Sequence, residues 1–402
     1  MHVLDGIKVV DLTAWAFCPA AGAVLASWGA EVIHIENPAS PDPMRLYDGG
    51  SIAPGKANWM FKHYNRGKKS LALDLASHDG REIFYGLIAQ ADVFLTSYLP
   101  ATRRKLGIDI DEVRAHNPQL IVAKGTGQGP LGPEAERGGF DGASWWSRGS
   151  LAASAMGVAD VDRPTGMVGH GDGMSGMVLA GGICAALVQR ERTGVPSVVD
   201  GSLLGTALWF NGPAVVSSNL DGVAPVFASK PARTDVPWSM STYRTDDGRF
   251  LYLSLIGDPQ SHWVDLCRHV GRPDLADDPR FADPRSRGAH NADLVTLFDE
   301  IFASRTYAEW GIALATLRGV WAPVQKADEM GADPQVVANG MIQKVRYDDG
   351  DLDLVGMPVM FDQRPAAIGR APDFGEHTEE ILASLDVSSA GIADFRARGV
   401  VG

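Results

Sequence analysis

The sequence predicts an α/β protein with a large Rossmann-like domain and a smaller central α/β domain. Two observations carry this prediction. Short apolar runs alternate with helical stretches in the N-terminal part, and 402 residues exceed what one hydrophobic core usually serves. The predicted strands are residues 6–12, 31–36, 70–74, 93–96 and 120–124. Short, nearly continuous apolar runs are typical of parallel strands that are buried on both faces.

The first strand, Gly6–Leu12, opens a βαβ unit with a helical segment from Ala20 to Trp28. A later helix is predicted from Gly80 to Gln90, so the alternation continues. The turn after the first strand reads Ala14-Trp-Ala-Phe-Cys-Pro19 and lacks the glycine pattern of a dinucleotide-binding loop. A nicotinamide site is therefore disfavoured, although the fold alone would suggest one.

The rest of the chain predicts a second module and a returning tail. An apolar helix ends near residues 191–194, and a strand at 197–200 and a helix through Phe210 follow it. After a loop-like stretch at 221–237, a hairpin turning at Asp247-Gly248 leads into a helical region through Ile301, which a polar stretch at 277–287 interrupts. Short strands and an amphipathic segment then suggest packing on the first module, at residues 341–346, 352–357 and 376–385. The expected domains are residues 1–220, 221–330 and 331–402.

Composition narrows the function classes. A net charge of −13 argues against a nucleic-acid or anionic-membrane partner, because both require a basic face. Cys18, Cys184 and Cys267 lack disulfide or zinc spacing, so we expect a reducing, cytoplasmic setting and no metal. No signal peptide is evident, and no apolar run approaches the ~20 residues of a membrane-spanning helix. Two basic clusters, 66–69 and 103–105, could meet a phosphate or could simply be solvated.

The stretch from Val168 to Gly176 is the strongest candidate for chemistry. Glycines surround Asp172 at the start of the apolar segment Met177–Val188, so a large ligand could approach its carboxylate closely. Free N–H groups at a helix start would keep that carboxylate ionised and stabilise a neighbouring oxyanion. Asp172 is therefore a candidate nucleophile for an acyl group. Taken alone, the spacing also fits an ordinary helix N-cap, and His170 could be a general base or a surface residue.

Several fragments together resemble the class III CoA-transferases, the group that includes formyl-CoA transferase, carnitine CoA-transferase and α-methylacyl-CoA racemase. They occur in the family's order along the whole chain, and their joint occurrence makes the match specific. The matching pieces are residues 4–13, 29–33, 65–70, 73–75, 139–141, 171–172, 191–194 and 371–378.

The resemblance implies a Rossmann-like domain built from both chain ends, a small central domain and an interlocked homodimer. It places the family's nucleophile on Asp172, which would form an aspartyl anhydride with an acyl group and then an aspartyl-CoA thioester that a carboxylic acid intercepts. Acyl-CoA is then a substrate, and no tightly bound cofactor is expected. For CoA the resemblance nominates Trp15, Ala16, Phe17, Lys68, Lys69, Ser97, Tyr98, Lys105 and Leu106.

Two departures from relatives refine the expected reaction. Racemases of this family carry a histidine directly before the residue matching Asp141, whereas Phe140 stands here, so the second base of a racemase is missing. Formyl-CoA transferase has a glutamine where Ala16 stands, which makes a small dicarboxylate a poor expectation. Trp15, Phe17, Trp145 and Trp146 instead suggest a bulky apolar acyl group, although aromatics at such spacing are more often plain core. The alternatives are a 2-methylacyl-CoA racemase and a non-catalytic CoA-binding paralogue.

Overall fold

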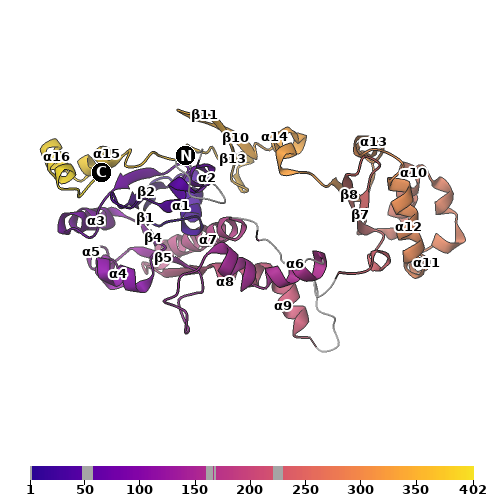
Figure 1. Cartoon of the computed structure of the whole chain (residues 1–402), viewed down its shortest axis with the longest axis horizontal. Helices are drawn as coiled ribbons and strands as arrows, with labels where there is room; N and C mark the ends of the chain where they lie inside the picture. Colours follow the sequence, from indigo (N-terminus) through magenta and orange to yellow (C-terminus); the bar gives the residue numbers. More distant parts are fainter. Residues whose placement is uncertain (1, 48–57, 160–165, 167–168, 221–229) are drawn as a thin grey trace. The chain divides into compact units, whose positions relative to one another are not determined.

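The computed structural model describes residues 2–47, 58–159, 166, 169–220 and 230–402 (Figure 1). The chain forms two compact units, each with its own core. The large unit contains residues 1–157, 161–228 and 334–402, and the small unit contains residues 158–160 and 229–333. Both ends of the chain therefore belong to the large unit.

The large unit is built on a parallel sheet with the strand order β3-β2-β1-β4-β5-β6. The predicted parallel α/β fold is confirmed, and two of its expected strands coincide with β2 and β4. The bounds are β1 Lys8–Leu12, β2 Glu31–Glu36, β3 Lys69–Ala72, β4 Val93–Thr96, β5 Ile121–Thr126 and β6 Val198–Ser202. Chain order reverses between β1 and β4. In open sheets of this kind, ligands bind outside the carboxyl ends of the strands at that point.

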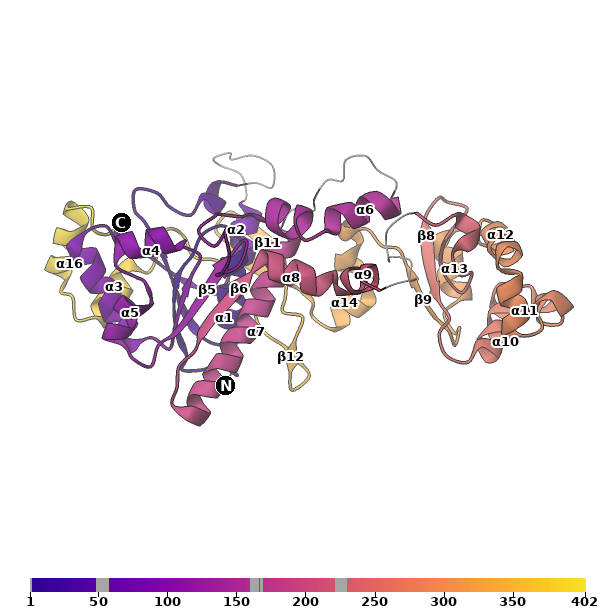
Figure 2. The same ribbon diagram turned by 90° about the horizontal axis from the view of Figure 1, so that it is seen from below.

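Helices cover both faces of this sheet (Figures 1 and 2). Alternate strand residues serve two cores: Val9 packs on the side of α1 and α7, whereas Val10 packs on the side of α3, α5, α15 and α16. The bounds of these helices are α1 Phe17–Ser27, α3 His78–Gln90, α5 Ile110–His116, α7 His170–Thr193, α15 Thr378–Ser384 and α16 Ser389–Ala397. Other helices are α2 Trp59–Tyr64, α4 Pro100–Leu106, α6 Leu151–Ala159, α8 Leu203–Phe210, α9 Gly212–Ser218 and α14 Pro334–Ala338.

Helix α7 corrects one expectation from the sequence. Its 24 residues are long and apolar enough, by length and composition alone, to cross a membrane. In the structure, however, α7 packs along α1 in the core of the large unit, and core helices pass the same test. The approach is close because Gly176 has no side chain: a Cβ there would lie 2.5 Å from Cβ of Ala20.

The small unit has its own sheet and its own aromatic core. The sheet has the order β7-β8-β9, and the predicted hairpin is confirmed, with Gly248 in its turn at φ +77°. In the predicted polar stretch at 277–287, residues 279–281 and 284–289 are helical, so this stretch is only partly irregular. Residues 221–229 of the predicted loop lie outside the described residues. The bounds are β7 Met240–Arg244, β8 Phe250–Ser254, β9 Val320–Pro323, α10 Pro259–His269, α11 Pro284–Ala289, α12 Asn291–Phe302 and α13 Tyr307–Ala313.

The C-terminal tail returns to the large unit. It first forms two antiparallel pairs, β10 Ile342–Tyr347 with β11 Gly350–Val355 and β12 Met360–Phe361 with β13 Arg364–Pro365. The chain then reaches the edge strand β3. There the N–H of His377 donates to the carbonyl of Ser70 at 3.0 Å, and Leu73 forms a bridge with Val401. These contacts place the tail against the edge strand of the sheet.

Candidate active site

A cavity of about 980 Å³ opens at the point where the strand order reverses. The turn after β1, the turn after β4 and the end of β5 all contribute to its wall, as parallel strands with a common carboxyl edge predict. Asp172 lies in this wall. The lining residues used below are Trp15, Phe17, Cys18, Met44, Tyr47, Met60, Ser97, Tyr98, Leu99, Thr102, Phe140, Asp141, Trp146, Gly169 and Asp172.

Asp172 reaches the cavity from the first turn of α7. The N-cap of this helix is Gly169, whose φ of +77° suits a glycine, so the simple N-cap interpretation of Asp172 is wrong. Asp172 stands third in the helix instead. One turn later, Gly176 allows α7 to pack close to α1. A Cβ on residue 176 would lie only 2.9 Å from the carbonyl oxygen of Phe17. The side chain of residue 172 is thereby brought beside the start of α1.

The surroundings of Asp172 favour the neutral form of its carboxyl relative to an ordinary Asp, contrary to the sequence expectation. Burial, and the negative charge of Asp141 after it, raise the pKa of Asp172 to about 7. The N–H groups of residues 169–171 favour the charged form of Asp141 instead, although Oδ1 of Asp141 makes no well-formed hydrogen bond with the described residues. Burial still raises the pKa of Asp141 overall. The helix start therefore acts on Asp141, and Asp172 titrates near neutral pH.

The three residues predicted to support the nucleophile differ in position. Phe140 lines the cavity, 58% exposed, with its ring edge-on to Trp15 at a centroid separation of 5.3 Å. Asp141 begins a π-helical segment, Asp141–Ser147, and also faces the cavity. His170 is exposed and borders a separate hollow with His63, so the structure does not bring it into the cavity wall. Its charge acts on Asp141, where it favours the ionised form.

Four of the residues nominated for CoA lie in the cavity wall: Trp15, Phe17, Ser97 and Tyr98. Ser97 also ties two strand ends together, because its Oγ accepts a 3.0 Å hydrogen bond from the N–H of Ala14. The other nominated residues lie elsewhere. Ala16 is buried in an apolar cluster, and Leu106 packs in the core on the α3 side. Lys105 is exposed near the end of α4. The ammonium of Lys69 donates hydrogen bonds to Glu31 and Glu380.

Lys68 is the clearest departure from the expected phosphate contact. Its ammonium is fully buried and bonds Asp11 and the amide oxygen of Asn65, each at 2.7 Å. An ammonium engaged in this way is not available to a bound phosphate, so this placement contradicts the predicted role. Within the basic cluster at 66–69, both lysines are thus engaged in ion pairs.

The chain is similar to known proteins over nearly its whole length. A model of CoA-transferase family III matches residues 4–378. The chain belongs to CoA-transferase family III. It is accordingly an enzyme of this class, and CoA thioesters are its substrates.

Curated relatives and solved structures agree with this membership. The chain is 31% identical to (R)-2-hydroxy-4-methylpentanoate CoA-transferase of Clostridioides difficile, with 99% of each chain covered. It is 27% identical to cinnamoyl-CoA:phenyllactate CoA-transferase of Clostridium sporogenes, covering 98% of this chain and 96% of the relative. A CAIB/BAIF family protein from Brucella suis superimposes with a TM-score of 0.79 at 28% identity, covering 96% of this chain and 100% of the other.

Two further cavity residues of this CoA-transferase, Cys18 and Met60, and the neighbouring Tyr64 escaped the sequence analysis. Tyr64 donates to the carbonyl of Gly169 at 2.9 Å, and burial raises its pKa, with the charge of Asp172 contributing. The thiol of Cys18 is buried, and the charge of Asp172 also raises its pKa. Met60 belongs to the same wall. The only signal for Tyr64 was its position just before the matching segment 65–70, because helical periodicity does not single it out.

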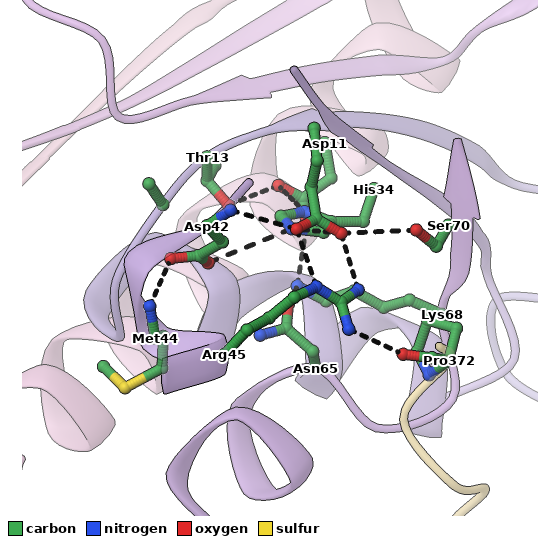
Figure 3. A network of polar contacts seen from close by, with 12 residues as sticks. Asp11, Thr13, His34, Asp42, Met44, Arg45, Asn65, Lys68, Ser70 and Pro372 are labelled. Atoms are coloured by element: carbon green, nitrogen blue, oxygen red, sulfur yellow. Dashed lines mark hydrogen bonds and ion pairs between the residues drawn. The ribbon is translucent and has the colours of Figure 1, made fainter. Parts of the chain in front are cut away.

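A buried charged cluster also escaped prediction (Figure 3). His34 of β2 lies 3.5 Å from Asp11, 3.9 Å from Glu36 and 4.0 Å from Asp42. Lys68 and Arg45 supply positive charge, with Arg45 paired to Glu36 at 2.6 Å. Such groups are costly to bury unless they are paired. Within the described ranges, no group of His, Cys, Asp and Glu side chains is arranged to hold a metal ion.

Proposed function

We propose that this enzyme moves CoA from an acyl-CoA to a free carboxylic acid through covalent intermediates on Asp172. A carboxylate oxygen of Asp172 attacks the thioester carbonyl, the C–S bond breaks, and an aspartyl anhydride and CoA thiolate form. The thiolate then attacks the aspartyl carbonyl, which releases the first acid and leaves an aspartyl-CoA thioester. An incoming carboxylate attacks that thioester, expels the thiolate and forms a second aspartyl anhydride. The thiolate then attacks the acyl carbonyl of this anhydride, which gives the new acyl-CoA and frees the Asp172 carboxylate.

The observation that carries the proposal is the placement of Asp172 in the wall of a large cavity at the sheet's switch point. With its pKa raised to about 7, the carboxylate is a stronger nucleophile than an ordinary Asp and is still substantially ionised at neutral pH. Burial also limits the water that would hydrolyse an anhydride. Asp141 places a negative charge near Asp172. Its proposed role is therefore to raise the pKa of Asp172 and not to act as the nucleophile itself.

CoA is proposed to enter along α4. Among the described lining residues there is no Lys or Arg, so the cavity suits the pantetheine arm and the acyl group better than phosphates. Leu99 and Thr102 of the α4 region line the cavity, and Lys105 lies three residues beyond Thr102 on the same helix face. This exposed ammonium is proposed to meet a phosphate of CoA.

The acyl group is proposed to be bulky and apolar. Trp15, Met44, Tyr47, Met60 and Phe140 form a continuous apolar part of the wall. The names of two relatives, which refer to a branched hydroxy acid and to aryl acids, support this class of acid.

Isotope transfer tests the covalent step directly. When the acceptor acid carries ¹⁸O in both carboxylate oxygens, one label must remain on Asp172 after the thiolate has taken the acyl group. Mass spectrometry of the peptide that contains Asp172 should show a gain of one ¹⁸O after a single turnover with unlabelled acyl-CoA, and of up to two after many turnovers. Asp141→Asn is the matched control and should still acquire the label. Transfer without label on that peptide, or near-normal turnover by Asp172→Ala, would remove the mechanism.

A homodimer is also proposed. One side of α7 and the end of α8 leave large apolar side chains uncovered: Val178 is 54% exposed, Val188 is 50% exposed and Trp209 is 85% exposed. Large apolar side chains that are exposed together on neighbouring elements are typical of interaction surfaces. A second copy of the chain is the proposed occupant.

A further inference from the structure

The turn between β1 and α1 contains a strained residue. Trp15 has a φ of +70°, in the left-handed region that side chains other than glycine rarely adopt. Its N–H donates a 3.0 Å hydrogen bond to Oδ1 of Asp42. Strain of this kind persists only where the surroundings hold the backbone in place, and it gathers at functional sites. Asp42 is the group that holds this turn.

Asp42 is itself well fixed. It is 4% exposed, and its Oδ1 accepts a second hydrogen bond, of 2.9 Å, from the N–H of Met44 (Figure 3). The N–H of Asp42 donates to Oε2 of Glu36 at 3.0 Å. A single carboxylate oxygen thus joins the Trp15 turn to the short helix at Pro43–Leu46.

The other carboxylate oxygen faces the buried charged cluster. Oδ2 of Asp42 has no hydrogen bond in the described part of the chain, and Nε2 of His34 lies 4.0 Å from it. Glu36, which anchors the backbone of Asp42, is held by Arg45. Asp42 is therefore attached on one side to the sheet through this cluster and on the other side to the cavity wall.

The residues that Asp42 fixes form one wall of the active site. The ring of Trp15 is edge-on to Tyr47 and to Phe140, at centroid separations of 6.4 Å and 5.3 Å. Met44 packs in the same apolar cluster as Met60. Met60 borders the start of α7, because a Cβ on Gly169 would lie 3.1 Å from its Cε. The wall therefore extends to the helix that carries Asp172.

We propose that Asp42 is a positioning residue that fixes the Trp15 backbone and so sets the enzyme's preference for bulky apolar over small acyl groups. The acyl preference rests on the proposed CoA transfer, whereas the fixing of Trp15 does not. An indole held at one position offers a preformed apolar contact, and preorganised contacts discriminate better than mobile ones. The side chain of Asp42 need not touch the substrate for this effect.

Transfer kinetics test the preference. The ratio of kcat/KM for a branched or aryl acyl-CoA to kcat/KM for acetyl-CoA should fall about tenfold in Trp15→Ala, a modest loss for a few apolar contacts. Asp42→Ala should reproduce that fall, and the double variant should fall no further, since both changes remove one interaction. Asp42→Asn keeps an acceptor oxygen and should restore the ratio. Asp258→Ala, which loses hydrogen bonds from two N–H groups in the small unit, is the matched control and should leave the ratio unchanged.

Fluorine NMR tests the positioning without any turnover. In protein labelled with 5-fluorotryptophan, the signal assigned to Trp15 by Trp15→Phe should shift or broaden in Asp42→Ala and stay in place in Asp42→Asn. An unmoved Trp15 signal and an unchanged selectivity ratio in a folded Asp42→Ala would overturn the inference, as would additive effects in the double variant. If wild-type protein transfers no CoA, the proposed function fails and the fluorine signal alone decides the role of Asp42.

Discussion

Asp141 and Asp172 face one cavity, and the charge of Asp141 acts together with burial to raise the pKa of Asp172 to about 7. The ionised carboxylate is the proposed nucleophile, so kcat/KM should rise with pH and level off above about pH 7. Asp141→Asn removes the neighbouring charge and should move this midpoint to lower pH. The pH dependence of kcat/KM for both proteins is the measurement. An identical midpoint in the two would show that Asp141 does not tune Asp172.

The same shift in pKa predicts a pH-dependent cost in stability. An Asp whose pKa is about 7 when folded and 3.8 when unfolded binds more protons in the folded state between these values. Stability therefore falls as pH rises through that window, and the loss is complete above about pH 7. Asp172→Asn should be more stable than wild type by about 2–4 kcal/mol at pH 8, and this advantage should shrink toward pH 4. Urea unfolding at both pH values measures it, and a pH-independent difference would contradict it.

Lys68 should prove to be a structural residue. Removing its ammonium leaves the fully buried Asp11 without its 2.7 Å partner, so Lys68→Met should lower the free energy of unfolding by about 3–5 kcal/mol. The pKa of Asp11 falls to about 2 in the folded protein, so this contribution should be present above pH 3.8 and disappear as pH falls through about 2. Lys69→Met is the control. Its ammonium is partly exposed, so the loss should be about 1 kcal/mol or less.

Gly176 should tolerate no side chain. A Cβ there would lie 2.5 Å from Ala20 and 2.9 Å from the Phe17 carbonyl, so Gly176→Ala must push α7 away from α1. We expect a loss of about 1–3 kcal/mol in unfolding free energy, together with a fall in kcat because Asp172 moves with the helix. In Gly86→Ala the new Cβ meets only Leu385 at 3.7 Å, so this helical control should be neutral or slightly stabilising. Equal effects of both changes on unfolding would argue against the close packing.

The proposed dimer should depend on the exposed face of α7 and α8. Val178→Lys and Trp209→Ser each alter a side chain that is more than half exposed in the single chain, at 54% and 85%. In sedimentation velocity, each should shift the protein toward monomer, because a buried charge or a lost aromatic anchor weakens an interface. Ile312→Ser changes an 81% exposed residue of the small unit and should not. A monomeric wild type would dispose of the dimer proposal.

The elements of the sheet were largely predictable, and the site was predictable only in part. Strands β2 and β4 have the predicted bounds. Strand β4 is a nearly continuous apolar run, as a strand buried on both faces requires, whereas β2 begins and ends with a glutamate. Trp15, Ser97 and Tyr98 meet at the cavity because parallel strands share one carboxyl edge. The role of Lys68 was missed. Its partner Asp11 is 57 residues away, and no local pattern shows which of two adjacent lysines points inward.

Local order along the chain was enough to determine the alternating strands and the setting of Asp172 among small residues. These features follow from side-chain size and periodicity within one segment. Tertiary structure alone decided that the start of α7 serves Asp141, that the pKa of Asp172 rises, and that Asp42 holds Trp15. Burial and electrostatic interaction are sums over neighbours in space. Here those neighbours come from the segments after β1 and β2 and from the π-helical segment, which are far apart in sequence.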